Sequence, residues 1–175
     1  NVVAGAKGLE AAARDARYAF LRSLPGKIAT AHTADDNVET VLMHLVRGTG
    51  LKGLGGITPV SANVIRPMLA VTRQDVEAFL EEWCLSHIED SSNGTDAFLR
   101  NRIRHHVMPL LKEENPNLAE SLSQTALQLR QDEEVLDRLS EPVNDVHALM
   151  QMEPGLRNRA LGKLLLHFGV KEPER

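Results

Sequence analysis

The chain has 175 residues, of which 42% are hydrophobic and 25% are charged, and its formal net charge at pH 7 is −4. This length suits one domain, or one domain and part of a second, with the composition of an ordinary globular protein. The negative charge and the few aromatic residues (four Phe, one Tyr, one Trp) argue against a strongly basic or stacking-based nucleic-acid binder. Contact with RNA would therefore need a local basic patch.

A single cysteine, Cys84, excludes a disulfide framework within the chain and a Cys-rich metal site. The low cysteine content fits a reducing, cytoplasmic location. No apolar run approaches the ~20 residues of a membrane span, so we expect no membrane partner.

The first predicted element is a helix over residues 9–24, which Pro25 and Gly26 end. Arg14 and Arg17 lie beside Tyr18 on this helix, where the pattern alone favours a solvated face.

A short apolar run at residues 28–31 is typical of a buried parallel strand, and polarity changes at His32. Thr33 is placed to cap a helix over residues 34–47, whose apolar positions follow helical spacing. Asp35 and Asp36 in its first turn would favour the helix dipole without any function. However, Glu39 shares their side of the helix, where like charges repel. The cluster therefore indicates a site for Mg²⁺ or an ammonium group at the carboxyl end of the strand.

Residues 48–56 contain five glycines, which predicts a loop rather than a helix interior. Such a loop can offer backbone N–H groups to phosphates or move as a lid, and Lys52 is its one charged residue. A second strand is predicted from Val64, ending at Pro67, and is followed by a helix that Thr72 caps. Its apolar side predicts that Phe79 and Trp83 are buried, and we expect Cys84 to lie in the core.

Residues 98–111 form the strongest basic patch of the chain. Ile103, Val107 and Leu110 predict a buried stripe, while Arg100 and Arg104 stand one turn apart on another side. This patch is either a solvated cationic helix or a phosphate-binding site. Arginine binds phosphate in a bidentate manner, which favours the second interpretation. Pro109 should kink or end this helix. A boundary at Asn115 to Asn117 then divides a domain of residues 1–114 from a helical domain of residues 115–175.

Four segments together resemble one family. The pattern His32-x-x-Asp35-Asp36-x-x-Glu39-Thr40 resembles a signature of the N-type ATP-pyrophosphatase (PP-loop) superfamily, and more narrowly of the tRNA(Ile)-lysidine synthetases. The segment from Glu10 to Tyr18, the glycine-rich segment from Arg47 to Leu54, and Asp90-Ser-Ser-Asn93 with Arg100-Asn-Arg-Ile-Arg104-His105 are similar to the same family. The resemblance covers about residues 9–115.

The resemblance implies an α/β fold: a parallel-sheet PP-loop ATPase domain followed by an all-helical second domain that handles tRNA. The family's Ser-Gly-Gly-x-Asp-Ser phosphate loop does not occur in this chain. We therefore expect the N-terminal strands to be missing and this chain alone to be inactive, with truncation and disorder both open as the reason.

The implied activity is a ligase that uses ATP and Mg²⁺. It would adenylate carbon-2 of the wobble cytidine of tRNA(Ile) with a CAU anticodon and then attach L-lysine there, so that the tRNA reads AUA instead of AUG. The runner-up is a PP-loop tRNA thiolase, against which the single Cys84 argues, and a non-catalytic RNA-binding module is the third possibility. A homodimer is left open.

The resemblance also implies roles for individual residues. Asp36, Arg104 and Arg14 are the expected catalytic residues, with Arg17 as the alternative to Arg14. Asp36 and Glu39 are expected to bind the lysine substrate, and Asp36 also Mg²⁺. His32 and Arg104 are expected to bind ATP or the base. Arg100, Arg102 and Lys52 are expected to bind tRNA or phosphate.

Overall fold

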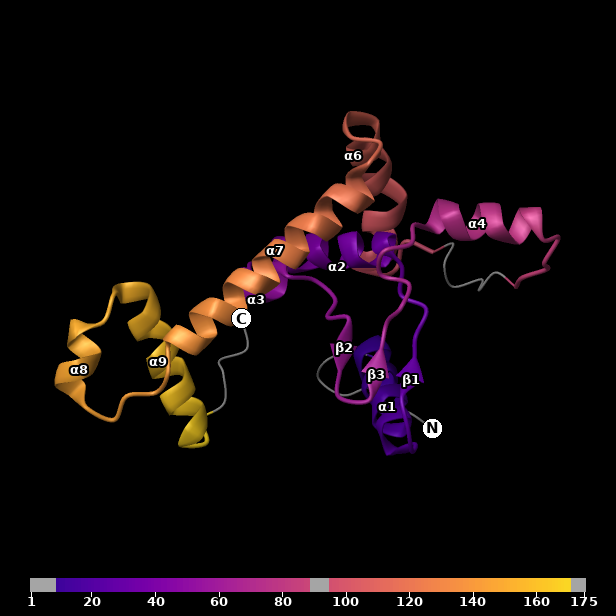
Figure 1. Cartoon of the computed structure of the whole chain (residues 1–175). Coiled ribbons are helices and arrows are strands. Elements are labelled where there is room, and N and C mark those ends of the chain that lie inside the picture. The colour runs from indigo at the N-terminus through magenta and orange to yellow at the C-terminus, as the bar shows by residue number, and fades with distance from the viewer. Residues whose placement is uncertain (1–8, 89–94, 171–175) are drawn as a thin grey trace. The chain divides into compact units, whose positions relative to one another are not determined.

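The computed structural model describes residues 9–88 and 95–170, apart from the side chains of residues 9–11 and 14. Over these residues it is a mixed α/β structure with a small three-stranded sheet (Figure 1). The strands are β1 (Ile28–Ala29), β2 (Val60–Ser61) and β3 (Val64–Ile65). The helices are α1 (Leu9–Ser23), α2 (Ala34–Arg47), α3 (Leu51–Leu54), α4 (Arg73–Glu82), α5 (Leu99–Arg102), the π-helical turn η2 (Ile103–Val107), α6 (Met108–Glu114), α7 (Leu118–Leu139), α8 (Val146–Gln151) and α9 (Pro154–His167). In the part of the chain described here, none of these helices has the length and apolar composition needed to cross a membrane.

Strand β3 lies in the middle of the sheet, between β1 and β2 (Figure 1). It runs parallel to β1, which confirms two parallel strands at these places. Both strands are shorter than predicted, and β1 is not buried, since Ile28 is half-buried and Ala29 is exposed. It runs antiparallel to β2, so the expectation of a purely parallel sheet is wrong for this third strand. The two strands are joined by a tight turn in which Ala62 has a positive φ of 53°. Alanine rarely adopts a positive φ, and the usual sequence signal for such a turn is glycine or asparagine at this position. The hairpin was therefore not predicted.

The chain divides into two compact units: Asn1–Asn37 with Ile57–Ile88, and Val38–Gly56 with Glu89–Arg175. The first unit contains the sheet, and the second contains the helices from α5 onward. Helix α2 begins in the first unit and continues in the second. The predicted boundary between residues 114 and 115 stays a prediction.

Helix α4 is capped as predicted but is more exposed than predicted. The Thr72 side chain accepts from the Asp75 N–H, and the Asp75 carboxylate accepts from the Thr72 N–H, which forms a complete capping box. The expectation of a buried apolar side is wrong, because Trp83 exposes 63% of its surface and Phe79 is also exposed. Cys84 does not lie in the core either; it is exposed, with a φ of 48°. It occupies the left-handed position of a Schellman motif, in which Cys84 N–H bonds Glu81 O and Leu85 N–H bonds Leu80 O.

The predicted helix over residues 98–111 continues through Pro109 to Glu114, but it contains the π-helical turn η2. There the Met108 N–H bonds to the Ile103 carbonyl, five residues back. This wider turn moves the buried side from Val107 and Leu110 to Met108, so the predicted stripe is correct only at Ile103. Pro109 has no N–H to donate, and this turn lets the helix pass it without a break.

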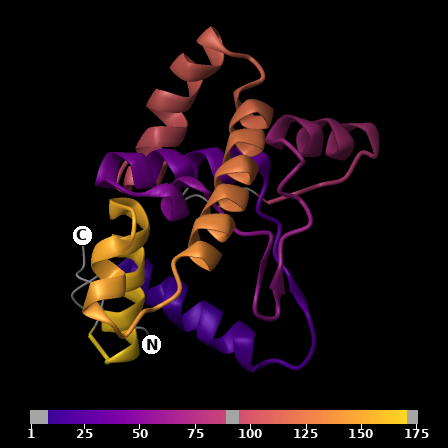
Figure 2. The same ribbon diagram turned by 60° about the vertical axis from the view of Figure 1, so that its left-hand side comes forward.

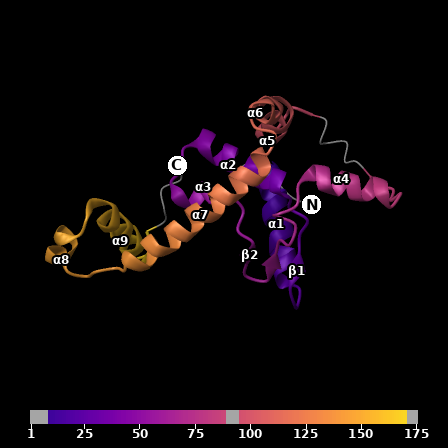
Figure 3. The same ribbon diagram turned by 45° about the horizontal axis from the view of Figure 1, so that its top comes forward.

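After a turn that follows α6, helix α7 reverses the direction of the chain (Figure 2). At the far end of α7, helices α8 and α9 pack together, and α9 packs on α7 (Figure 3). Two ion pairs join α9 to α7: Arg159 Nη2 lies 2.6 Å from Glu133 Oε2, and Lys163 Nζ lies 2.9 Å from Asp137 Oδ1.

The first of these ion pairs makes the attachment of α9 depend on pH. The hydrogen bond from Arg159 holds the pKa of Glu133 below the ordinary value of a glutamate. Its contribution to stability is therefore complete above the unfolded value and is lost as the pH falls through the lower folded value. We expect Glu133→Gln to lower the melting temperature by about 2 °C at pH 7, as for a pair worth under about 1 kcal/mol. Thermal unfolding from pH 7 to pH 3 should show this difference vanish at the acidic end; a constant difference would contradict it.

Candidate active site

The carboxylate of Glu39 is buried between two arginines of the basic patch. Arg100 Nε donates to Glu39 Oε2 at 2.7 Å. Arg104 donates twice, from Nε to Oε1 at 2.6 Å and from Nη2 to Oε2 at 2.9 Å. Glu39 is only 1% exposed, so this charge would be costly without its partners. The structure therefore joins two motifs that lie 61 to 65 residues apart in the sequence.

Helical spacing explains why both arginines reach one carboxylate. Arg100 and Arg104 lie four residues apart on α5 and η2, which places them on the same side of the helix. Buried Ile103 anchors the helix next to Arg104. The arginine side chains keep 22% and 19% of their surface exposed. Both guanidinium groups are therefore partly accessible to solvent or to an anion.

Asp36 lies at the start of α2, where it closes a capping box with Thr33. Its Oδ2 atom accepts from the Thr33 N–H at 2.9 Å and from the Thr33 hydroxyl at 3.1 Å. In return, the Asp36 N–H donates to Thr33 Oγ1 at 3.3 Å. This confirms Thr33 as the predicted cap. Asp36 remains half-buried.

The neighbours of Asp36 hold the backbone around it. Asp35 is buried, and its Oδ2 accepts from the N–H of Arg73, the first residue of α4, at 2.7 Å. Asn37 is also buried, and its Oδ1 accepts from the Ile57 N–H at 2.7 Å. Sequence reasoning missed Asn37, although its position four residues before buried Val41 places it on the apolar side of the helix.

His32 follows β1 at the carboxyl end of the strand, as predicted. It is half-buried, and its Nδ1 lies 3.0 Å from the Thr30 hydroxyl. This contact orients the imidazole ring, and the residue stays partly exposed.

The other predicted cations do not meet at the Glu39 cluster. Arg102 Nη1 donates to the carbonyls of Asp96 and Ala97, at 3.0 and 3.3 Å. Lys52 is exposed and lines a pocket with carboxylates of α7. The Arg14 side chain and the segment Asp90-Ser-Ser-Asn93 lie outside the described residues.

A second charged group at the start of this helix was not predicted. The exposed Asp96 carboxylate contacts His105 Nδ1 at 2.9 Å and His106 Nε2 at 2.7 Å. The hydrogen bonds from His106 and His105 lower the pKa of Asp96. In the sequence the two histidines read only as part of the basic patch, and nothing singled out Asp96 as their partner.

The described residues do not form a metal centre by themselves. Among them, no three His, Cys, Asp or Glu side chains are arranged so that they could hold a metal ion. The second unit supplies the Glu39, Arg100 and Arg104 cluster, and the first unit supplies the half-buried side chains of Asp36 and His32.

Comparison with known proteins shows which protein family this chain resembles. A model of the PP-loop domain matches residues 1–111. The tRNA(Ile)-lysidine synthase of Geobacter sulfurreducens is 44% identical over 154 residues, which are 84% of this chain and 33% of that protein. The protein of the same name from Geobacillus kaustophilus is 43% identical over 76% of this chain, and that from Parabacteroides distasonis is 43% identical over 67%.

The chain spans about a third of the length of these relatives, 33%, 31% and 28% respectively. The resemblance inferred from the His32 to Thr40 pattern and the arginine-rich segment is thereby confirmed. Since the PP-loop model matches well over half of its residues, the chain belongs to the PP-loop domain family.

Proposed function

We propose that this chain is part of a tRNA(Ile)-lysidine synthetase. The observation that carries the proposal is its 44% identity, over 84% of the chain, to a relative named tRNA(Ile)-lysidine synthase. In the proposed reaction, the oxygen on carbon-2 of the wobble cytosine attacks the α-phosphate of ATP and pyrophosphate leaves. An amine of L-lysine then attacks carbon-2, loses a proton and displaces AMP, which gives lysidine.

Arg104 and Arg100 suit the first step. Negative charge develops on the α-phosphate and its oxygens as the bond to pyrophosphate breaks, and preorganised guanidinium groups stabilise such charge. Arg104 is proposed as the catalytic residue of the pair, and Arg100 as a phosphate-binding one. In this proposal Glu39 holds both forks in place, since each of its carboxylate oxygens accepts from an arginine.

Asp36 suits the second step. The carboxylate of this half-buried residue can bind an ammonium group of lysine, and can help to take the proton that the attacking amine loses. The predicted lysine-binding role of Glu39 stays a prediction, and it would require an arginine to release one of the carboxylate oxygens. His32 is proposed to hydrogen-bond ATP or the base.

A PP-loop domain implies ATP binding. The partly exposed guanidinium groups of Arg100 and Arg104 fit the phosphate groups of such a ligand. For Mg²⁺, the half-buried Asp36 would be the protein ligand, since Mg²⁺ bound to nucleotides commonly takes one or two carboxylates and completes its shell with phosphates and water. When bound, the ion would neutralise phosphate charge during adenylation.

The tRNA(Ile) substrate would contact the glycine-rich loop with Lys52, and the surface that carries Arg102. Arg14 is proposed as a further catalytic arginine, as the family pattern implies. We propose that the enzyme acts in the cytoplasm, and the homodimer stays open.

The test uses the complete reading frame that encodes this chain. The protein is incubated with an unmodified tRNA(Ile) transcript, Mg-ATP and L-lysine, and the digested nucleosides are weighed. We expect a cytidine heavier by one lysine less one water. Asp36→Ala should reduce the rate of its formation about 100-fold at low lysine concentration, and excess lysine should restore part of the rate.

Asp36→Asn is the matched variant, because it keeps an acceptor for the Thr33 N–H and removes only the charge. If both variants lose activity while the melting temperature stays constant, the carboxylate charge is required. A wild-type protein that binds tRNA without a mass change would overturn the ligase assignment in favour of an RNA-binding module. A gain of sulfur with a sulfur donor would point to the thiolase.

A further inference from the structure

The glycine-rich loop of residues 48–56 is not free; side chains from two helices hold it. His44 of α2 contacts the carbonyl of Gly53 through Nδ1 at 2.8 Å. Arg130 of α7 donates from Nη1 to the carbonyl of Gly55. Because a carbonyl can only accept, the His44 proton must be on Nδ1. All four residues belong to the same compact unit.

The loop is also more ordered than its glycine content predicts. Residues 51–54 form the short helix α3, so the expectation that no helix could form there is wrong. The α3 turn closes with a bond from the Gly55 N–H to Leu51 O at 2.9 Å. A helix of this length has little stability of its own and needs tertiary contacts, which α7 provides by packing against it (Figure 3).

Gly55 and Arg130 fit each other closely. Gly55 is buried, and a Cβ atom at this position would lie 2.8 Å from Arg130 Cγ. The aliphatic stem of Arg130 therefore passes over Gly55 in space that any other residue would fill. Burial lowers the pKa of the Arg130 guanidinium, and the Glu134 carboxylate opposes this. Arginine nevertheless stays charged in proteins, so the Gly55 carbonyl accepts a charge-assisted hydrogen bond.

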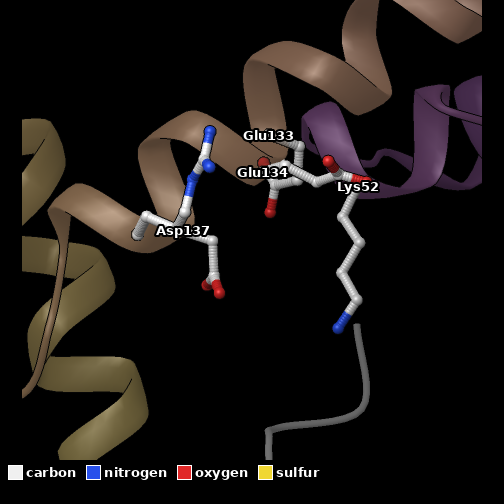
Figure 4. Close-up of a pocket in the computed structure, with 5 residues that line it drawn as sticks. Lys52, Glu133, Glu134 and Asp137 are labelled. Carbon is white, nitrogen blue, oxygen red and sulfur yellow. The ribbon is translucent and has the colours of Figure 1, made fainter.

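Helix α7 also faces Lys52 of the loop. A pocket of ≈ 400 Å³ lies between them, lined by Lys52 of α3 and by Glu133, Glu134, Asp137 and Arg138 of α7 (Figure 4). The carboxylates attract the Lys52 ammonium group, which contributes slightly to the lowered pKa of Glu133, after the larger effect of Arg159. The same helix thus determines both the backbone of the loop and the electrostatic surroundings of its only cation.

We infer that Arg130 is a positioning residue, which holds the glycine-rich loop from α7 in the conformation that binds a substrate phosphate. This rests on the proposed function, because it takes the loop and Lys52 to contact a phosphate of ATP or of tRNA. Both substrates share this chemistry. The packing of α7 on α3 then controls how often the loop adopts the conformation that binds the phosphate.

The experiment compares Arg130→Met with wild type in the complete reading frame. Methionine keeps much of the apolar stem and removes every donor. Hydrogen exchange of the amides of Gly53 to Gly56 should accelerate about tenfold, as expected for the loss of a charge-assisted hydrogen bond. KM for one phosphate substrate should rise about tenfold while kcat changes less than threefold. A rise in KM for ATP would show that the loop binds a phosphate of ATP. A rise in KM for tRNA would show that it binds a phosphate of the tRNA.

Arg138→Met is the matched control, since Arg138 is an exposed arginine on the same helix that also lines the pocket. It should leave loop exchange and both KM values unchanged. Arg130→Lys keeps a cation for the Gly55 carbonyl and should give intermediate values, which separates positioning from misfolding.

Loop exchange in Arg130→Met equal to that in Arg138→Met would overturn the inference. Faster exchange with unchanged KM values would overturn the link between the loop and the substrate phosphate. Neither result would contradict the ligase activity itself. That activity is tested separately, by the mass of the nucleoside that the wild-type protein forms.

Discussion

Replacing Glu39 by glutamine is expected to lower the free energy of unfolding by about 3 kcal/mol, the low end of the range for removing one member of a buried ion pair. The carboxylate is 1% exposed and accepts from Arg100 and Arg104. A glutamine amide would offer one acceptor and would point N–H groups at a guanidinium. The arginines keep about a fifth of their surface in water, which limits the loss. Denaturation by urea should show a lower midpoint with an unchanged m-value.

Glu113→Gln provides the control, since Glu113 is exposed on α6. It should change the free energy of unfolding by less than about 0.5 kcal/mol. A double-variant cycle of Glu39→Gln with Arg100→Met should reveal a coupling energy, because both changes act on the same hydrogen bond. If Glu39→Gln costs no more than Glu113→Gln, the three-residue cluster does not exist in solution.

Arg104→Ala is expected to reduce the rate of lysidine formation about 100- to 1,000-fold, as for the removal of a group that stabilises developing charge. Arg104 makes two of the three hydrogen bonds to Glu39, so its fork is the better oriented of the pair. Single-turnover formation of lysidine at saturating ATP and lysine would measure the effect on chemistry rather than on binding.

Arg104→Lys separates this role from stability. Lysine still compensates the charge of Glu39 but lacks the planar fork, so the fold should persist while the rate stays at least tenfold reduced. Arg100→Ala disturbs the same carboxylate and should affect binding of the phosphate substrate more than the rate of chemistry. Activity of Arg104→Ala within twofold of wild type would exclude Arg104 from the reaction.

The parts of the fold that could be predicted depend on neighbours in the chain. Thr33 and Thr72 predict where their helices begin, because each capping threonine and its acidic partner lie three residues apart in the sequence. The strand before His32 was likewise evident from an abrupt change of polarity. The left-handed Cys84 was not, because glycine is the usual signal for that cap.

The residues of the candidate site stand out in the sequence, but their pairings do not. Repulsion among Asp35, Asp36 and Glu39 indicated a site for Mg²⁺ or an ammonium group, which stays a prediction, whereas in the structure Glu39 pairs with two arginines of the same chain. The pattern could not show that the partner of Glu39 is Arg104, 65 residues away in the same chain, because that distance is closed only by tertiary folding. Asp35 bonds instead to a backbone N–H of α4, a contact with no sequence signal at all.

The π-helical turn has a consequence for deletions. A π turn holds one more residue than an α turn, so deleting a single residue between Arg104 and Pro109 could convert it to ordinary α-helix. The helix on either side would then keep nearly the same relative rotation, because the π turn accommodates one extra residue within a single turn, and Met108 would stay on the buried side with Ile103. A deletion in the α-helical residues of α6 would instead rotate everything that follows by about 100°. The π turn is thus where this helix best tolerates the loss of a residue.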